Sequence, residues 1–122
     1  MVAPVFRPGP GPIDHAKYSL LSPEAPWRVV LDTGKVVVVR MFVANDDGMT
    51  LRAEAELDGA KLEGLTAWVN LARDGVPVGQ IRAIREVVRA LDRLAYTGRG
   101  DWHYVAELCA PGTPTRAELA AR

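Results

Sequence analysis

The spacing of apolar residues in the first half of the chain predicts β-strands separated by tight turns. In segment 49–57 apolar and polar residues alternate strictly, which is typical of a strand with one face in the core and one in water. Segment 35–44 is apolar at almost every position, so we expect a central strand buried on both faces. Asp-Gly pairs tolerate the positive φ of hairpin turns and separate several of these segments. The predicted strands are 27–31, 35–44, 49–57 and 61–72.

Segment 61–72 fits both a strand and a helix, because its apolar residues match either period. The Asp74-Gly75 pair that follows it, together with its β-branched residues, favours the strand. On that strand Trp68 lies on the face opposite Leu65 and Val69, so it is expected to be partly exposed. An exposed tryptophan is a candidate partner-binding residue.

The second half of the chain predicts one long helix at about 79–96. Segment 102–109 then alternates as a last strand, with Trp102, Tyr104, Ala106 and Leu108 on one face. Thr115 and Glu118 form a capping-box pattern for a short helix at 116–121. These elements predict an α+β fold in which an antiparallel β-meander sheet is packed by one long amphipathic helix and followed by a short C-terminal helix. The apolar stripe of the long helix consists of Ile81, Ile84, Val87, Val88, Leu91, Leu94 and Ala95.

Residues 1–26 differ from the rest of the chain because they contain six of its nine prolines. Proline lacks an N–H and fixes φ, so we expect an extended Pro/Gly-rich arm, in polyproline-II conformation in places, in place of a helix or a central strand. The predicted organisation is therefore an arm at 1–26, an α+β domain at 27–110 and a C-terminal tail at 111–122. Apolar residues along the arm are candidates for contact with a partner; they include Val5, Phe6, Ile13 and Tyr18.

Composition narrows the function classes. Fifteen basic and fifteen acidic residues give a formal net charge of zero, so we do not expect nucleic acid to be the main partner. Acids are concentrated in 46–63 and arginines in 73–101, which favours head-to-tail contact between copies. Cys109 is the single cysteine, so no disulfide can form within the chain. We expect no signal peptide and no membrane span, and a location in the cytoplasm or within an assembled particle.

Arginines recur at spacings of three and four along one side of the predicted long helix. Such a row can bind phosphates, a nucleic-acid backbone or an acidic neighbour. The alternative is a solvated surface on which Glu86 and Asp92 form ordinary ion pairs with the arginines. We favour that alternative over nucleic acid, and an acidic hairpin of a second copy over DNA. The row consists of Arg82, Arg85, Arg89 and Arg93.

Neither a metal site nor a catalytic constellation is indicated. His15 and His103 are far apart in sequence and have no ligand spacing between them. His103 and Cys109 would lie about 20 Å apart on one strand, which is too far for a nucleophile and its base. We therefore expect no cofactor and no metal.

The plan of a compact domain with an extended tether is similar to that of small structural proteins of viral or bacterial shells and tails. This analogy of architecture leads us to expect a non-enzymatic assembly protein, for example a virion, capsid or bacteriophage component. It would form a homo-oligomer or part of a larger lattice, with the arm embracing a neighbour. One alternative is a small nucleic-acid-associated regulatory domain that uses the arginine row. A second is a small-ligand binder or enzyme with an unrecognised site.

Overall fold

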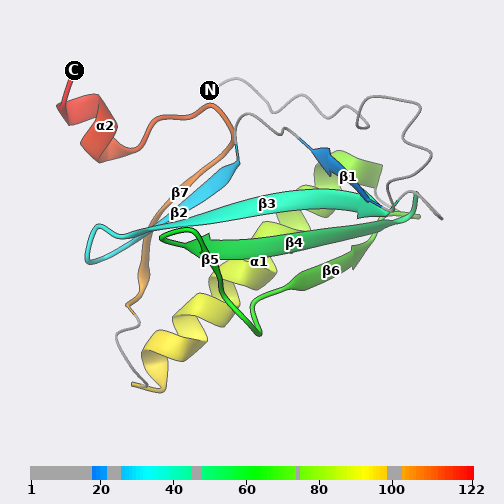
Figure 1. The fold of residues 1–122 in the computed structure, drawn as a ribbon, viewed down its shortest axis with the longest axis horizontal. Helices are drawn as coiled ribbons and strands as arrows, with labels where there is room; N and C mark the ends of the chain where they lie inside the picture. Colours follow the sequence, from blue (N-terminus) through cyan, green and yellow to red (C-terminus); the bar gives the residue numbers. More distant parts are fainter. Residues whose placement is uncertain (1–17, 22–25, 45–47, 74, 99–102) are drawn as a thin grey trace.

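The computed structural model describes residues 18–21, 26–44, 48–73, 75–98 and 103–122 of the chain. Its described strands form one antiparallel sheet, and one long helix crosses a face of that sheet (Figure 1). A short second helix follows the last strand. The predicted α+β fold is confirmed. In chain order the elements are β1 (Tyr18–Leu21), β2 (Trp27–Leu31), β3 (Val36–Ala44), β4 (Thr50–Leu57), β5 (Ala60–Lys61), β6 (Ala67–Asn70), α1 (Gly75–Tyr96), β7 (Val105–Cys109) and α2 (Arg116–Ala120).

The sheet is built around β3, and its main strand order is β5-β4-β3-β2-β7. Strands β2, β3 and β4 follow one another as the predicted meander. The second half of β3 pairs with β1, and its first half pairs with β2, on the edge opposite β4. Strand β6 pairs with β4 beside β5. The ambiguous segment 61–72 is thus not helical: it contributes the end of β5, a turn and β6.

Strand β1 lies inside the region that the sequence assigned to the arm. Residues 18–21 contain no proline, so each of them can take part in a β-ladder with β3. The sheet therefore begins at Tyr18, before the predicted domain boundary at residue 27. Residues 1–17, with Val5, Phe6 and Ile13, lie outside the described residues.

Helix α1 packs on β4 and β6, and its buried side closes the core. It begins at Gly75, four residues earlier than predicted, because Pro77 lies in the first turn, where a helix needs no N–H donor. Gly79 brings the helix close to the sheet, since a Cβ at this position would collide with the buried side chain of Leu71. The fully buried core includes Val29, Val37, Val39, Leu51, Ala53, Ile84, Val87 and Leu91.

The predicted apolar stripe of α1 is not buried throughout, and the apolar residues of β7 are largely uncovered. Ile81 was expected in the core but is 46% exposed, because it lies on the side of α1 that β4 and β6 do not cover. Tyr104, Ala106 and Leu108, which alternate on one face of the predicted last strand, are exposed. Strand β7 is at the edge of the sheet, beyond the reach of α1 over most of its length, so few side chains cover it.

The other face of the sheet has no helix over it in the described part of the chain (Figure 1). We call it the open face. On β3 the residues of this face, among them Val38, Arg40 and Phe42, are half-buried, whereas Val37 and Val39 on the helix side are completely buried. The expectation that β3 is buried on both faces is therefore wrong, because one layer of helix covers one face.

The tail is attached to the sheet through Arg28 of β2. Its guanidinium donates to the Thr113 carbonyl at 2.6 Å and pairs with the Glu118 carboxylate at 2.7 Å. The predicted capping box is confirmed: Thr115 Oγ1 accepts from Glu118 N, and Glu118 Oε1 accepts from Thr115 N. Helix α2 buries no residue of its own and stands apart from the sheet in Figure 1. The capping box, Arg28 and the Glu107 carboxylate of β7, which accepts from the Arg116 N–H at 3.0 Å, thus hold this helix.

Among the described residues, no helix is both long and apolar enough to cross a membrane.

Candidate functional site

The predicted surface residues lie on two opposite sides of the molecule. Trp68 belongs to β6 and lies on the open face, whereas Arg82, Arg85, Arg89 and Arg93 are exposed on α1, on the other side of the sheet. Tyr18, a predicted arm residue, is the first residue of β1 and pairs with Ala44. The structure therefore offers two separate candidate surfaces.

On the open face, Phe42, Arg52 and Trp68 form a row across three neighbouring strands. Arg52 is the register partner of both Phe42 on β3 and Trp68 on β6. Its guanidinium carbon lies 5.2 Å from the centre of the Phe42 ring and 5.6 Å from that of the Trp68 ring. A cation over an aromatic face is attracted by the ring quadrupole, so Arg52 holds both rings in place. Trp68 nevertheless remains 53% exposed, as the strand interpretation predicted.

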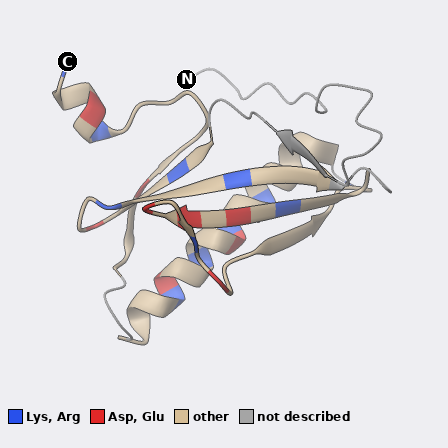
Figure 2. Cartoon of the chain, in the orientation of Figure 1, with Lys and Arg blue, Asp and Glu red and all other residues tan. Residues whose placement is uncertain are grey.

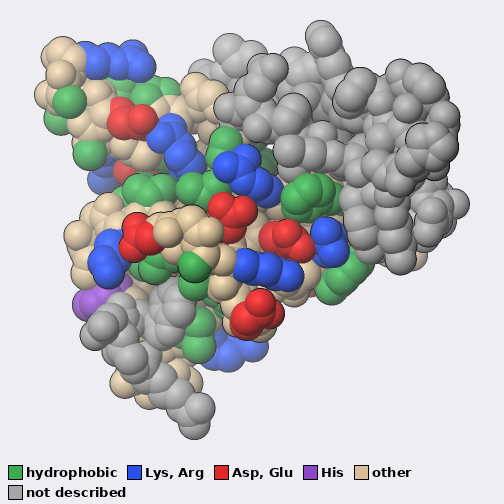
Figure 3. Space-filling view, viewed as in Figure 1, with side chains coloured by type: hydrophobic (Ala, Val, Ile, Leu, Met, Phe, Trp, Pro, Cys, Tyr) green, Lys and Arg blue, Asp and Glu red, His purple; other side chains and the backbone are tan. Residues whose placement is uncertain are grey.

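The charged side chains of the open face are paired with one another. Arg40 lies 3.5 Å from Glu56, Arg52 lies 3.2 Å from Glu54, and Lys61 lies 3.5 Å from the same Glu54 carboxylate. In Figure 2 a basic band on β3 lies beside acidic and basic bands on β4, and Figure 3 shows acidic and basic side chains side by side across this face. Two acids of the predicted acidic hairpin are thus neutralised within the chain.

The arginines of α1 are in a different situation. Arg85, Arg89 and Arg93 make no ion pair with any described residue, and neither does Glu86. Asp92 accepts a hydrogen bond from the backbone N–H of Val105 at 3.0 Å, which ties α1 to the start of β7. The intrahelical ion pairs considered from the sequence are therefore absent for these three arginines.

A groove lies between α1 and the segment 64–67, which runs from the turn after β5 into β6. It comprises two hollows of about 330 and 480 Å³. Both are lined by Gly64, Leu65, Ala90 and Arg93, so they form one continuous feature. Gly64 has a φ of 83°, which lets the chain turn at the rim of the groove.

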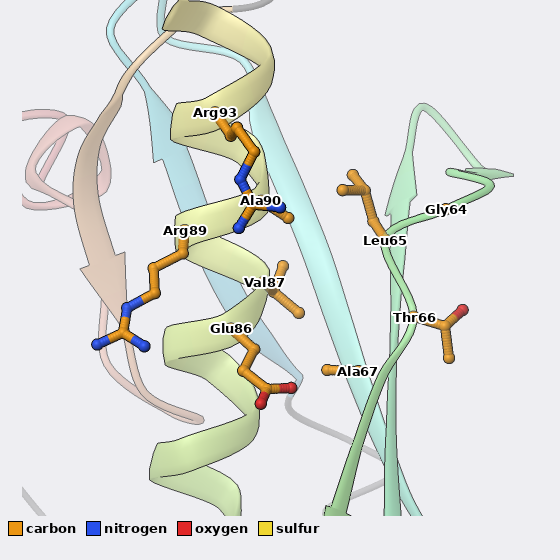
Figure 4. A pocket seen from close by; sticks show the side chains of 9 residues that line it. All are labelled: Gly64, Leu65, Thr66, Ala67, Glu86, Val87, Arg89, Ala90 and Arg93. Carbon is orange, nitrogen blue, oxygen red and sulfur yellow. The ribbon is translucent and has the colours of Figure 1, made fainter.

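The smaller hollow, shown in Figure 4, has an apolar middle and a charge near each end, and the larger one continues past Arg93 to Leu94 and Thr97. Val87 and Leu65, both buried, face each other across it. The Arg93 side chain lies over Ala90 towards one end, and Glu86 lies towards the other, near Ala67. Arg93 and Glu86 are seven residues apart on α1, about 10 Å along the axis. Arg89 borders the same groove but points away from the 64–67 segment.

Sequence reasoning did not find this groove. It treated 61–72 as one strand, so the turn that forms one wall was not expected. The one available signal was Gly64 in the middle of that segment, since an isolated glycine in a strand pattern marks an interruption.

The histidine and the cysteine of the described region do not come together. His103 Nδ1 lies 3.2 Å from Asp32 Oδ1 in the turn between β2 and β3. Cys109 is buried, and its thiol donates to the Glu107 carboxylate at 3.4 Å. Burial, and then the hydrogen bond and charge of Glu107, raise the pKa of Cys109, which disfavours the reactive thiolate. The described residues also contain no cluster of three or more potential metal ligands.

Comparison of the chain with models of protein families, with curated proteins and with solved structures found no match.

Proposed function

We propose that this chain is a non-enzymatic assembly protein that forms a homo-oligomer or part of a larger lattice, such as the shell or tail of a virion, with its arm embracing a neighbour. The observation that carries the proposal is the exposed Trp68 in the Phe42–Arg52–Trp68 row. Tryptophan and arginine are the residues that most often dominate the binding energy of protein interfaces.

The row has the properties of an interface anchor. Trp68 offers a large apolar surface, and its ring is already held by Arg52, so little side-chain freedom is lost on binding. Around it, the paired charges of β3 and β4 form a polar border that needs no outside counter-ion. An open sheet face of this kind suits a flat protein partner better than a small molecule.

Size-exclusion chromatography with light scattering tests the proposal on three variants of the full chain. Deletion of residues 2–16 removes the arm but leaves β1 intact, and Trp68→Ala removes the anchor. We expect both changes to shift the protein towards smaller species. For Trp68→Ala the dissociation constant of self-association should rise by about 30-fold. Tyr96→Ala is the matched control, because Tyr96 is an aromatic residue on α1 that is 80% exposed. A wild-type chain that stays monomeric beside its natural neighbours, unchanged by either alteration, would contradict the proposal.

A second candidate function is favoured by Arg85, Arg89 and Arg93 of α1, which have no ion-pair partner among the described residues. A small nucleic-acid-associated domain could bind phosphates with this face, since released counter-ions would then supply the affinity. A gel shift with all four arginines changed to glutamine tests it: binding that weakens steeply with salt and disappears in the variant supports nucleic acid. The neutral net charge of the chain is the reason we rank it second.

A further inference from the structure

The groove beside α1 fits an extended segment that carries a negative and a positive charge about 10 Å apart. Arg93 and Glu86, near the two ends of its smaller hollow, make no ion pair with any described residue, so neither charge is already satisfied by such a contact. Between them the wall residues Val87, Leu65 and Ala67 are apolar. A bound segment should therefore place an acid near Arg93, a base near Glu86 and small or apolar groups between them.

The arm of this chain contains such a segment directly before β1. Its sequence is Ile13-Asp14-His15-Ala16-Lys17, and Pro12 precedes it. In a polyproline-II conformation three residues complete one turn and rise about 9 Å, so Asp14 and Lys17 project from the same side. This separation is close to the rise of about 10 Å between Glu86 and Arg93 along α1. Ile13 and Ala16 share a second side, next to the first, which can contact the apolar wall.

A chain's own arm cannot reach its own groove with this segment. Leu21, Met41, Ala53 and Ala67 form one row of register partners, so Leu21 lies about 14 Å across the sheet from the groove wall. Tyr18 lies about 10 Å further along β1, and Lys17 is bonded directly to it. The occupant must therefore come from a second copy.

We infer that the groove between α1 and segment 64–67 binds residues 13–17 of the arm of a second copy, with Asp14 against Arg93 and Lys17 against Glu86. This inference rests on the proposed function and adds the place where the arm binds. It also assigns different roles to the two candidate surfaces, since the groove lies on the helix side and Trp68 on the open face.

Photo-cross-linking locates the arm directly. A benzophenone amino acid in place of Ala16 of the full chain, followed by irradiation and mass spectrometry, should give cross-links to peptides containing 64–67 or 86–93. Mixing of ¹⁴N- and ¹⁵N-labelled protein distinguishes cross-links between copies from those within one. Cross-links to the open face, or within a single copy, would overturn the inference while leaving the assembly function standing. A chain that remains monomeric would contradict both.

Charge reversal tests the pairing of the ends. Arg93→Glu should weaken self-association about tenfold, because it replaces an attraction to Asp14 with a repulsion. Combining it with Asp14→Arg should restore most of the loss. Arg85→Glu is the matched control, since Arg85 is an exposed arginine of the same helix that does not line the groove. Equal effects of Arg93→Glu and Arg85→Glu, or no recovery in the double variant, would reject the pairing.

Discussion

The open face of the sheet and the outer surface of α1 both carry many charges, but they use them differently. On the open face Arg40, Glu54, Glu56 and Lys61 satisfy one another across neighbouring strands. On α1, by contrast, Arg85, Arg89 and Arg93 have no ion-pair partner in the described part of the chain. The number of charges on a surface therefore does not tell whether they are available to a partner.

The difference follows from the geometry of the two elements. Register partners on adjacent strands lie about 5 Å apart, so opposite charges on β3 and β4 meet with little loss of side-chain freedom. On a helix the nearest neighbours are three and four residues apart, and the outer positions of α1 are mostly arginines. Glu86 and Asp92 are the acids of this helix, and Asp92 is used by the backbone of β7.

The largest expected effect is on the free energy of unfolding, and it compares a residue on the covered side of α1 with one on its uncovered side. Ile84→Ala should lower the free energy of unfolding by about 2–5 kcal/mol, because Ile84 is completely buried against the sheet. Ile81→Ala, three residues away, should cost less than about 1 kcal/mol because half of that side chain is in water. Urea denaturation measures both. Equal losses would mean that α1 is rotated relative to the structure.

A smaller difference in the free energy of unfolding is expected between an arginine with partners within the chain and one without an ion pair among the described residues. Arg52→Ala should cost about 1 kcal/mol, because it removes the contacts with both the Phe42 and the Trp68 ring. Arg93→Ala should leave the free energy of unfolding unchanged within about 0.5 kcal/mol. Urea denaturation measures both variants. Arg52→Ala should also alter the tryptophan fluorescence of the folded state. A loss at Arg93 as large as at Arg52 would show that the helix arginines are structural.

The smallest effect concerns the tail and depends on pH. The Thr115 N–H, and then Arg28, lower the pKa of Glu118 below its ordinary value of 4.5. Because the pKa of Glu118 is lower in the folded state than in the unfolded state, ionised Glu118 stabilises the tail at pH values above 4.5. This stabilisation is lost as the pH falls through the folded-state pKa. Amide protection of α2, corrected for the intrinsic exchange rate, should therefore be lost as the pH falls below 4.5 while the sheet stays protected. Glu118→Gln should show fast exchange at neutral pH and no further acid step.

Local sequence patterns were sufficient to predict most of the fold. The strict alternation in 49–57 and the helical stripe of α1 each have one interpretation, because the period of their apolar residues is unambiguous. The capping box of Thr115 and Glu118 is equally local, since both partners lie within four residues. Exposure of Trp68 followed directly from the strand interpretation.

Burial that depends on how the helix lies over the sheet could not be predicted from local sequence patterns. The pattern placed Ile81 in the apolar stripe of α1 and the apolar residues of β7 on one face of a strand. The path of α1 over β4 and β6 leaves both at the margin of the core. Burial of β3 on both faces failed for the same reason. The groove forms where α1 and segment 64–67 come together in the fold. No short-range sequence pattern predicts such a tertiary contact.

The attachment of the last strand has a consequence for how the chain folds during synthesis. Strand β7 pairs with β2, and Arg28 of β2 bonds a carbonyl 85 residues later. A growing chain can form the β2–β3–β4 hairpins early, but one edge of β2 stays unpaired until β7 has emerged from the ribosome. An unpaired edge is a template for joining other chains. Completion of the sheet thus comes late, and nascent or truncated chains that end before β7 should be the species that aggregate.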